Sequence, residues 1–316
     1  MQALRAVAAI GVAIFHAGQW TGINLHTGAA GVDLFFVISG LVMWLITEER
    51  ETQPLAFLWR RVRRVAPLYW LATLVTVALT PFSRHLWWDV RPELGHILLS
   101  LAFIPHYNPA GLPFPVLAQG WTLTYEALFY GLFAIALLLP RNIQFLSLTF
   151  ALSAIFIFGI ANPPLYMLGA NAQLGEFVLG MGLGRAVLAK GLPPPFWGLA
   201  AILLGFAALF ASWPIGGDDP GNWRLIVWGL PAAAIVGGAL SLERAGRWPR
   251  LPWLETLGDA SYAIYLAHRL AIAGVALSLA VLPLAALLPL AIAAAVVAGL
   301  VVHLWIERPL LKALKL

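Results

Sequence analysis

Two polar residues of the first apolar stretch, Arg5 and His16, have types and a spacing that suit chemistry. Eleven residues turn a helix through three turns and roughly 20°, so both side chains project from one face. Along the axis they are roughly 16 Å apart, about half the hydrocarbon thickness of a bilayer. A cation and an imidazole on one stripe predict the two ends of a polar path. The alternative is an arginine that reaches the headgroups and a histidine bonded to a neighbouring helix.

A carboxylate follows in the next apolar stretch, where Asp33 lies about one turn into a predicted helix. If the two helices run antiparallel, Asp33 and His16 lie at one depth. An unpaired aspartate at membrane depth costs about 2.5–3.5 kcal/mol, so a partner is expected. An Asp33–His16 contact would fix the imidazole tautomer and raise its basicity, as a general base requires. A purely structural Asp–His bond is the alternative.

Four arginines, Arg60, Arg61, Arg63 and Arg64, precede the third long apolar stretch. Arginine forks match phosphate oxygens in a bidentate way. The cluster therefore suits a phosphate-bearing ligand. Taken alone, it more often sets topology or touches anionic lipid.

Glu126 lies about two turns inside the predicted helix 119–139, at a depth similar to His16. Nothing in its own helix neutralises it, so we expect it to face a cavity or another helix. It could orient an acceptor hydroxyl, pair with Arg5 or Arg269, or stay protonated.

Aromatic and imidazole side chains complete the candidate set. Trp121, Tyr125 and Phe129 share one helix face at spacings of four. Such a stripe is a sugar platform less often than it is core packing or an interface belt. His268 shares a face with Tyr265, and we expect it to be an accessory polar residue rather than a second base.

No metal cofactor is predicted. The chain has no cysteine, which excludes disulfides, thiolate catalysis and cysteine-ligated metals. His26, His85, His96 and His106 lie in or beside predicted loops and form no metal-ligand spacing. His303 lies in the last apolar stretch with no carboxylate at matching spacing, and we expect it to be structural.

Long apolar segments must position these residues. Hydrophobic residues make up 61% of the 316 and charged residues 10%, whereas a soluble domain carries about 25% charge. Uninterrupted apolar runs exclude the alternation of a transmembrane barrel, so we predict one all-α membrane domain over 1–316. The net charge of +5 does not predict a nucleic-acid partner, because the basic residues fall in short loops between helices. Residues 1–18 resemble a signal peptide, but a second helix follows at once and cleavage is not expected.

About ten helices are predicted to cross the membrane. The apolar piece 94–105 is too short to span, and segment 94–118, rich in proline and glycine, is expected to be a re-entrant or interfacial element lining a cavity. Most basic residues then fall on one side, which places both termini in the cytoplasm. The predicted spans are 3–20, 31–48, 66–82, 119–139, 143–161, 173–190, 194–212, 223–241, 259–281 and 284–306.

The candidate residues lie in motifs that follow one another along nearly the whole chain. These are the Arg5–His16 stretch, GVDLFFVISG (31–40), FLWRR with RRVAPLYW (57–70), WTLTYEALFY (121–130), EFVLGM (176–181), SYAIYLAH (261–268) and ERP (307–309). Together they resemble the membrane acyltransferase family 3. The chain ends after the tenth predicted span, without the SGNH-type domain fused to some relatives, so no acceptor is inferred from those.

The resemblance implies an O-acyltransferase that uses cytoplasmic acyl-CoA, with acetyl-CoA the expected donor, and a carbohydrate or glycolipid acceptor. His16 would deprotonate an acceptor hydroxyl or accept the acyl group transiently. The expected roles are catalytic for His16, Asp33 and Glu126, cofactor-binding for Arg5, Arg60 and Arg61, and substrate-binding for Trp121, Tyr125 and His268.

The expected location is the bacterial inner membrane, as a multi-pass protein whose partners are the lipid bilayer, acyl-CoA and the acceptor, with no nucleic acid. The alternative function is a transporter or flippase for a lipid-linked sugar or small solute. Intramembrane ionisable residues suit that class equally. The sequence has no visible inverted repeat, which tells against it.

Overall fold

The structure is a computed structural model that describes residues 1–48, 53–82, 91–161, 172–212, 219–249, 251–279 and 281–315. All regular structure within these ranges is helical, which confirms the predicted all-α class. The helices are α1 Gln2–Thr21, η1 His26–Ala30, α2 Gly31–Glu48, α3 Pro54–Leu79, η2 Thr80–Phe82, α4 Leu94–Leu101, η3 Ala118–Gly120, α5 Trp121–Ala136, α6 Arg141–Ala161, α8 Gln173–Leu188, α9 Pro195–Ala211, η5 Gly221–Trp223, η6 Leu225–Gly229, α11 Leu230–Arg244, α12 Pro252–Asp259, α13 Ser261–Ser278, α14 Leu284–Val302, η7 His303–Glu307 and α15 Arg308–Ala313.

Six helical segments of the described chain are long and apolar enough to cross a membrane, or seven if the bent pair α12 and α13 is one span. The pair bends by 72°, between Asp259 and Ser261. Three further predicted spans are the helices α5, α8 and α9, of 16, 16 and 17 residues, which are short for a crossing. A multi-helix membrane protein is therefore supported, while the count of about ten stays a prediction.

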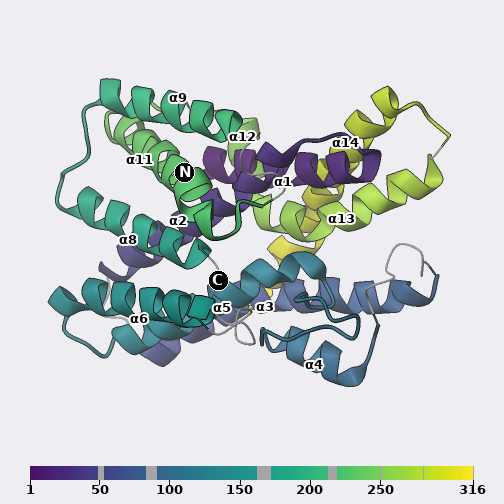
Figure 1. Ribbon diagram of the computed structural model, residues 1–316, viewed down its shortest axis with the longest axis horizontal. Coiled ribbons are helices and arrows are strands. Elements are labelled where there is room, and N and C mark those ends of the chain that lie inside the picture. The colour runs from purple at the N-terminus through teal and green to yellow at the C-terminus, as the bar shows by residue number, and fades with distance from the viewer. Residues whose placement is uncertain are drawn as a thin grey trace.

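Helices α1 and α2 lie at the centre of the molecule (Figure 1). Helix α1 packs against α12, α13 and α14, whereas α2 packs against α8 and α11. In a further group, α5 packs against both α3 and α6, and α6 packs against α8. The first two helices thus touch most of the bundle, and they carry Arg5, His16 and Asp33.

Two glycines bring the backbones of α2 and α8 into contact. A Cβ atom on Gly40 would overlap the carbonyl group of Phe177, and one on Gly180 would overlap that of Val37. Small residues permit this close approach of membrane helices. Gly182, on the same helix α8, faces open space instead.

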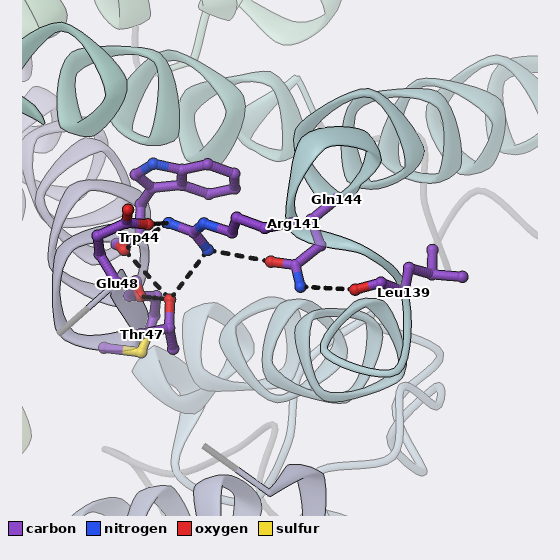
Figure 2. Close-up of polar contacts among 7 residues, drawn as sticks. Trp44, Thr47, Glu48, Leu139, Arg141 and Gln144 are labelled. Carbon is purple, nitrogen blue, oxygen red and sulfur yellow. Dashed lines mark hydrogen bonds and ion pairs between the residues drawn. The ribbon is translucent and has the colours of Figure 1, made fainter. Parts of the chain in front are cut away.

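A cation at the start of α6 ties this helix to the end of α2 (Figure 2). The Arg141 guanidinium lies 3.8 Å from the ring centroid of Trp44 and 2.6 Å from a carboxylate oxygen of Glu48. It also donates to Gln144 Oε1 at 3.0 Å. This arginine is used in packing rather than left for a ligand.

Segment 94–118 folds against α3 and forms part of a cavity wall. Tyr69 Oη donates to the carbonyl oxygen of Ser100 at 3.2 Å, and Trp70 Nε1 donates to that of Leu101 at 2.8 Å. The segment beyond α4 lines the cavity described next. The expected cavity-lining role is confirmed, whereas its depth in a membrane stays a prediction.

Candidate functional site

The larger cavity, which we call the His16 cavity, has a volume of about 480 Å³. It lies between α1, the segment before α5, α5 itself, the residues before η6 and α13. Its polar lining includes His16, Gln19, Trp121, Tyr125, Arg224 and Arg269. The cavity thus combines imidazole, guanidinium and aromatic groups around one space.

His16 is held by a residue of its own helix. Its Nδ1 lies 2.9 Å from Oε1 of Gln19. Because an amide oxygen only accepts hydrogen bonds, the His16 proton is on Nδ1 and Nε2 keeps a lone pair. The spacing of three places the two side chains on one helix face, so this contact could have been predicted from the sequence. His16 therefore has the tautomer of a base that acts through Nε2.

The expected Asp33–His16 contact is wrong, because Asp33 pairs with Arg224. Both carboxylate oxygens of the fully buried Asp33 accept, from Arg224 Nε at 3.0 Å and from a terminal nitrogen at 2.8 Å. Arg224 also lies 3.3 Å from Asp219 and stacks over Trp228. A bidentate guanidinium compensates a buried carboxylate better than a neutral imidazole does. A catalytic role for Asp33 remains a prediction.

His268 supports the ring of His16. The two rings stack with centroids 5.0 Å apart and planes inclined by 30°. His268 is fully buried, and its Nδ1 donates to the carbonyl oxygen of Tyr265 at 2.6 Å. Its Nε2 has no hydrogen-bond partner within the described ranges. The contact with the acceptor that we expected for His268 is not tested by this arrangement.

The aromatic stripe of α5 divides between cavity and core. Trp121 and Tyr125 line the His16 cavity and meet edge to face, with centroids 6.0 Å apart. Phe129 is fully buried and stacks on Phe177 at 4.1 Å. Two of the three rings are thus placed where a ligand in this cavity would touch them.

A second cavity of about 160 Å³, which we call the arginine cavity, lies between α1, α2, α3, α5 and α13. Three cations, Arg5, Arg61 and Arg64, line it. Arg5 Nε donates to Ser261 Oγ at 3.2 Å, and Arg64 pairs with Glu307 at 3.2 Å. This grouping suits a ligand that carries phosphates.

The arginines of α3 are sorted by helix face. Arg60 lines neither cavity. Arg63 donates to the carbonyl oxygen of Leu314 at 2.8 Å. Arg61 and Arg64, three residues apart, share the face toward the arginine cavity. Sequence reasoning favoured Arg60 and Arg61 and missed this spacing.

Glu126 lies on the arginine side rather than beside His16. It lines the arginine cavity and accepts hydrogen bonds from Ser39 Oγ at 2.7 Å and from the hydroxyl of Tyr130. Arg5 is within its electrostatic reach. The similar depth inferred for Glu126 and His16 therefore does not bring them into one cavity.

His303 has a carboxylate partner, contrary to expectation. Its Nδ1 lies 2.6 Å from Oε2 of Glu307, four residues on. The helix continues past its predicted end at 306 through η7, which brings Glu307 onto the same helix face as His303. Because Glu307 also pairs with Arg64, the contact joins the last long helix to α3.

The two cavities adjoin. Val32 and Tyr265 line both of them. Arg5 and His16, near opposite ends of α1, line one cavity each. The predicted path between these two residues therefore corresponds to a pair of neighbouring cavities.

Sequence comparisons identify relatives of the chain. A family model described as an acyltransferase domain matches residues 1–308. The exopolysaccharide production protein ExoZ of Rhizobium meliloti (strain 1021) is 40% identical over 309 residues, covering 95% of this chain and 94% of ExoZ. The O-acetyltransferase OatA of Staphylococcus aureus (strain NCTC 8325 / PS 47) is 28% identical over 316 residues, covering 85% of this chain and 49% of OatA. The peptidoglycan O-acetyltransferase OatA of Listeria monocytogenes serovar 1/2a is 27% identical over 244 residues, covering 69% of this chain and 34% of that protein. No solved structure matches the chain.

Proposed function

We propose that this chain, which belongs to the acyltransferase family whose model matches residues 1–308, transfers an acetyl group from acetyl-CoA to a hydroxyl of a carbohydrate. The observation that carries the proposal is the adjoining pair of cavities, one holding His16 and the other three arginines. The O-acetyltransferase names of two relatives support acetyl as the group. The exopolysaccharide name of the third supports a polysaccharide or its precursor as acceptor. Family membership favours this enzyme over a transporter.

We place the donor phosphates in the arginine cavity. Coenzyme A carries a pyrophosphate and a 3′-phosphate, and Arg5, Arg61 and Arg64 supply guanidinium groups for them. The pantetheine arm is about as long as four extended residues, roughly 13–14 Å. Arg5 and His16 lie roughly 16 Å apart along α1. The arm therefore reaches from the arginines toward His16, while Arg60 stays a predicted outer contact.

His16 acts as the general base of the reaction. Its Nε2 takes the proton of the acceptor hydroxyl as that oxygen attacks the thioester carbonyl carbon. The new C–O bond forms, the C–S bond breaks, and coenzyme A leaves as a thiolate that takes the proton from the imidazolium. The products are an acetyl ester and free coenzyme A, with His16 neutral again. Glu126 stays on the donor side, where it attracts Arg5.

The acceptor occupies the His16 cavity. Trp121 and Tyr125 offer ring faces and edges to a sugar, and His268 keeps the His16 ring in place by stacking. Asp33 serves this site by holding Arg224 in the cavity wall. These assignments change the expected tasks of Asp33 and Glu126, and they leave Arg60 outside both cavities.

In the membrane, we propose ten spans with both termini in the cytoplasm, in the bacterial inner membrane. The arginine cavity then faces the side where acetyl-CoA is made, and the His16 cavity faces the other side. Segment 94–118 closes part of the outer wall. Residues 1–316 form one catalytic domain in this arrangement.

A transfer assay tests the function. Purified protein in nanodiscs is mixed with acetyl-CoA and a panel of oligosaccharides, with permethylated oligosaccharides as matched controls. We expect coenzyme A release that depends on free acceptor hydroxyls, and an acceptor whose mass rises by one acetyl group. In sealed proteoliposomes, movement of the acceptor across the bilayer without acetylation would contradict the proposal and favour a transporter.

A further inference from the structure

We propose that Tyr265 is a further catalytic residue, whose hydroxyl donates a hydrogen bond to the thioester carbonyl oxygen as that oxygen becomes negative. The inference rests on the proposed acetyl transfer and adds the group that stabilises its charged intermediate. Tyr265 lines both cavities and is only 6% exposed. The reacting carbonyl must pass this residue, because the phosphate-binding arginines line one cavity and the base lines the other.

The ring of His268 lies between the ring of Tyr265 and that of His16, the proposed base. Its ring centroid lies 5.8 Å from that of His268, which stacks on His16. Its carbonyl oxygen accepts the hydrogen bond that orients His268. On its other side the ring meets Phe35 edge to face at 6.0 Å. Packing therefore holds the phenol at the junction of the cavities.

The hydroxyl of Tyr265, the hydroxyl of Thr122 and the carbonyl oxygen of Gln119 form a triangle, in which they lie within hydrogen-bond distance of one another. It lies 2.9 Å from Thr122 Oγ and 3.0 Å from the carbonyl oxygen of Gln119. Thr122 Oγ lies 3.2 Å from the same Gln119 oxygen. Two hydroxyl protons serve three contacts, so the Gln119 oxygen stays satisfied if Thr122 alone donates to it. The proton of Tyr265 can then turn to a ligand.

The other two tyrosines of the arginine cavity lack this freedom. Tyr262 donates to the carbonyl oxygen of Val65 at 2.7 Å. Tyr130 donates to the carboxylate of Glu126. Turning either proton away would sacrifice a bond to a backbone carbonyl or a strong bond to a charged group. Of the three tyrosines that line the arginine cavity, Tyr265 is therefore the one best able to change its acceptor.

The chemistry needs a donor at this point. When the acceptor oxygen attacks, the electron pair of the thioester C=O moves onto its oxygen, and it returns when the C–S bond breaks. A hydrogen bond to that oxygen strengthens as the charge grows, so it lowers the barrier more than it tightens substrate binding. Tyr265 keeps its proton throughout, and no other reactant is required.

Tyr265→Phe tests the proposal. Loss of one oxyanion donor typically lowers kcat by about 10²–10³-fold, so we expect that fall in acetyl transfer. The KM for acetyl-CoA and the thermal unfolding temperature should stay unchanged. Tyr69→Phe is the matched control, since it removes a buried phenol hydroxyl that donates to a backbone carbonyl oxygen and lines neither cavity. It should keep a kcat close to wild type.

A second variant tests the triangle. Thr122→Val leaves the Gln119 oxygen dependent on Tyr265, so turning the phenol costs one hydrogen bond and kcat should fall by about tenfold. Thr122→Ser should restore it. A Tyr265→Phe protein with kcat within a few-fold of wild type overturns the proposal, as does one that loses acetyl-CoA affinity at unchanged kcat. A wild-type protein without transfer overturns the proposed function itself, and this inference with it.

Discussion

At the scale of single residues, two of the central side chains depend on neighbours that were not predicted. Gln19 fixes the tautomer of His16, and it does so without adding a charge. Arg224 takes both carboxylate oxygens of Asp33. Asp33 is therefore expected to hold the cavity wall, whereas the tautomer of His16 is set by a neighbour within α1.

A charge-pair test separates this role from the orientation of His16. Removing one partner of a buried pair typically costs about 3–5 kcal/mol, so Asp33→Asn and Arg224→Gln should each lower the free energy of unfolding by that order. The double variant removes both charges, and it should regain much of the stability and the transfer rate. Thermal unfolding and kcat are measured for all three. If the Asp33→Asn protein has normal stability but is inactive, and Arg224→Gln does not rescue it, then Asp33 acts directly on His16 as first predicted.

At the scale of elements, the crossing of α2 and α8 positions one wall of the arginine cavity. Gly40 and Gly180 let the two backbones touch. Ser39, next to Gly40, donates to Glu126 in the arginine cavity. A shift of α2 away from α8 would therefore move Ser39 and the wall of that cavity.

Two substitutions on α8 test the crossing. Gly180→Ala places a methyl group against the carbonyl of Val37, and such overpacking typically costs about 1–3 kcal/mol. Gly182→Ala adds the same group in open space, where it should be neutral or stabilising by about 0.5–1 kcal/mol. Thermal unfolding in detergent compares the two. Equal destabilisation by both would mean that the backbones are not in contact.

At the scale of the whole molecule, the site is a path rather than a pocket. The arginine cavity and the His16 cavity meet at Val32 and Tyr265, and polar residues of α1 line both, Arg5 the first and His16 with Gln19 the second. In the proposed reaction, the donor and the acceptor approach from opposite ends and react at the junction. Charged side chains accompany both cavities, with Arg224 paired to Asp33 at the wall of the His16 cavity and Glu126 beside Arg5 in the arginine cavity.

Helical periodicity predicted what lies within one helix and little of what lies between helices. The common face of Arg5 and His16, and the pairing of Trp121 with Tyr125, follow from spacing alone. The Asp33–Arg224 pair joins residues 191 positions apart, so spacing carries no trace of it. Likewise, the place of Tyr265 between two cavities depends on how α13 packs against α5. Hydropathy also does not fix the number of spans, because helices α5 and α8, of 16 residues each, are short for a membrane crossing.

The measurement that tests the central claim most directly separates binding from transfer at the two ends of the path. Acetyl-CoA affinity and the acetyl-transfer rate at saturating acetyl-CoA are determined for His16→Ala and Arg61→Ala, with Arg63→Ala, on the same helix as Arg61 and outside both cavities, as the control. His16→Ala should keep wild-type affinity and lose about 10²–10⁴-fold in rate. Arg61→Ala should lose about ten- to a hundred-fold in affinity and keep its saturated rate. Near wild-type transfer by His16→Ala would contradict the account.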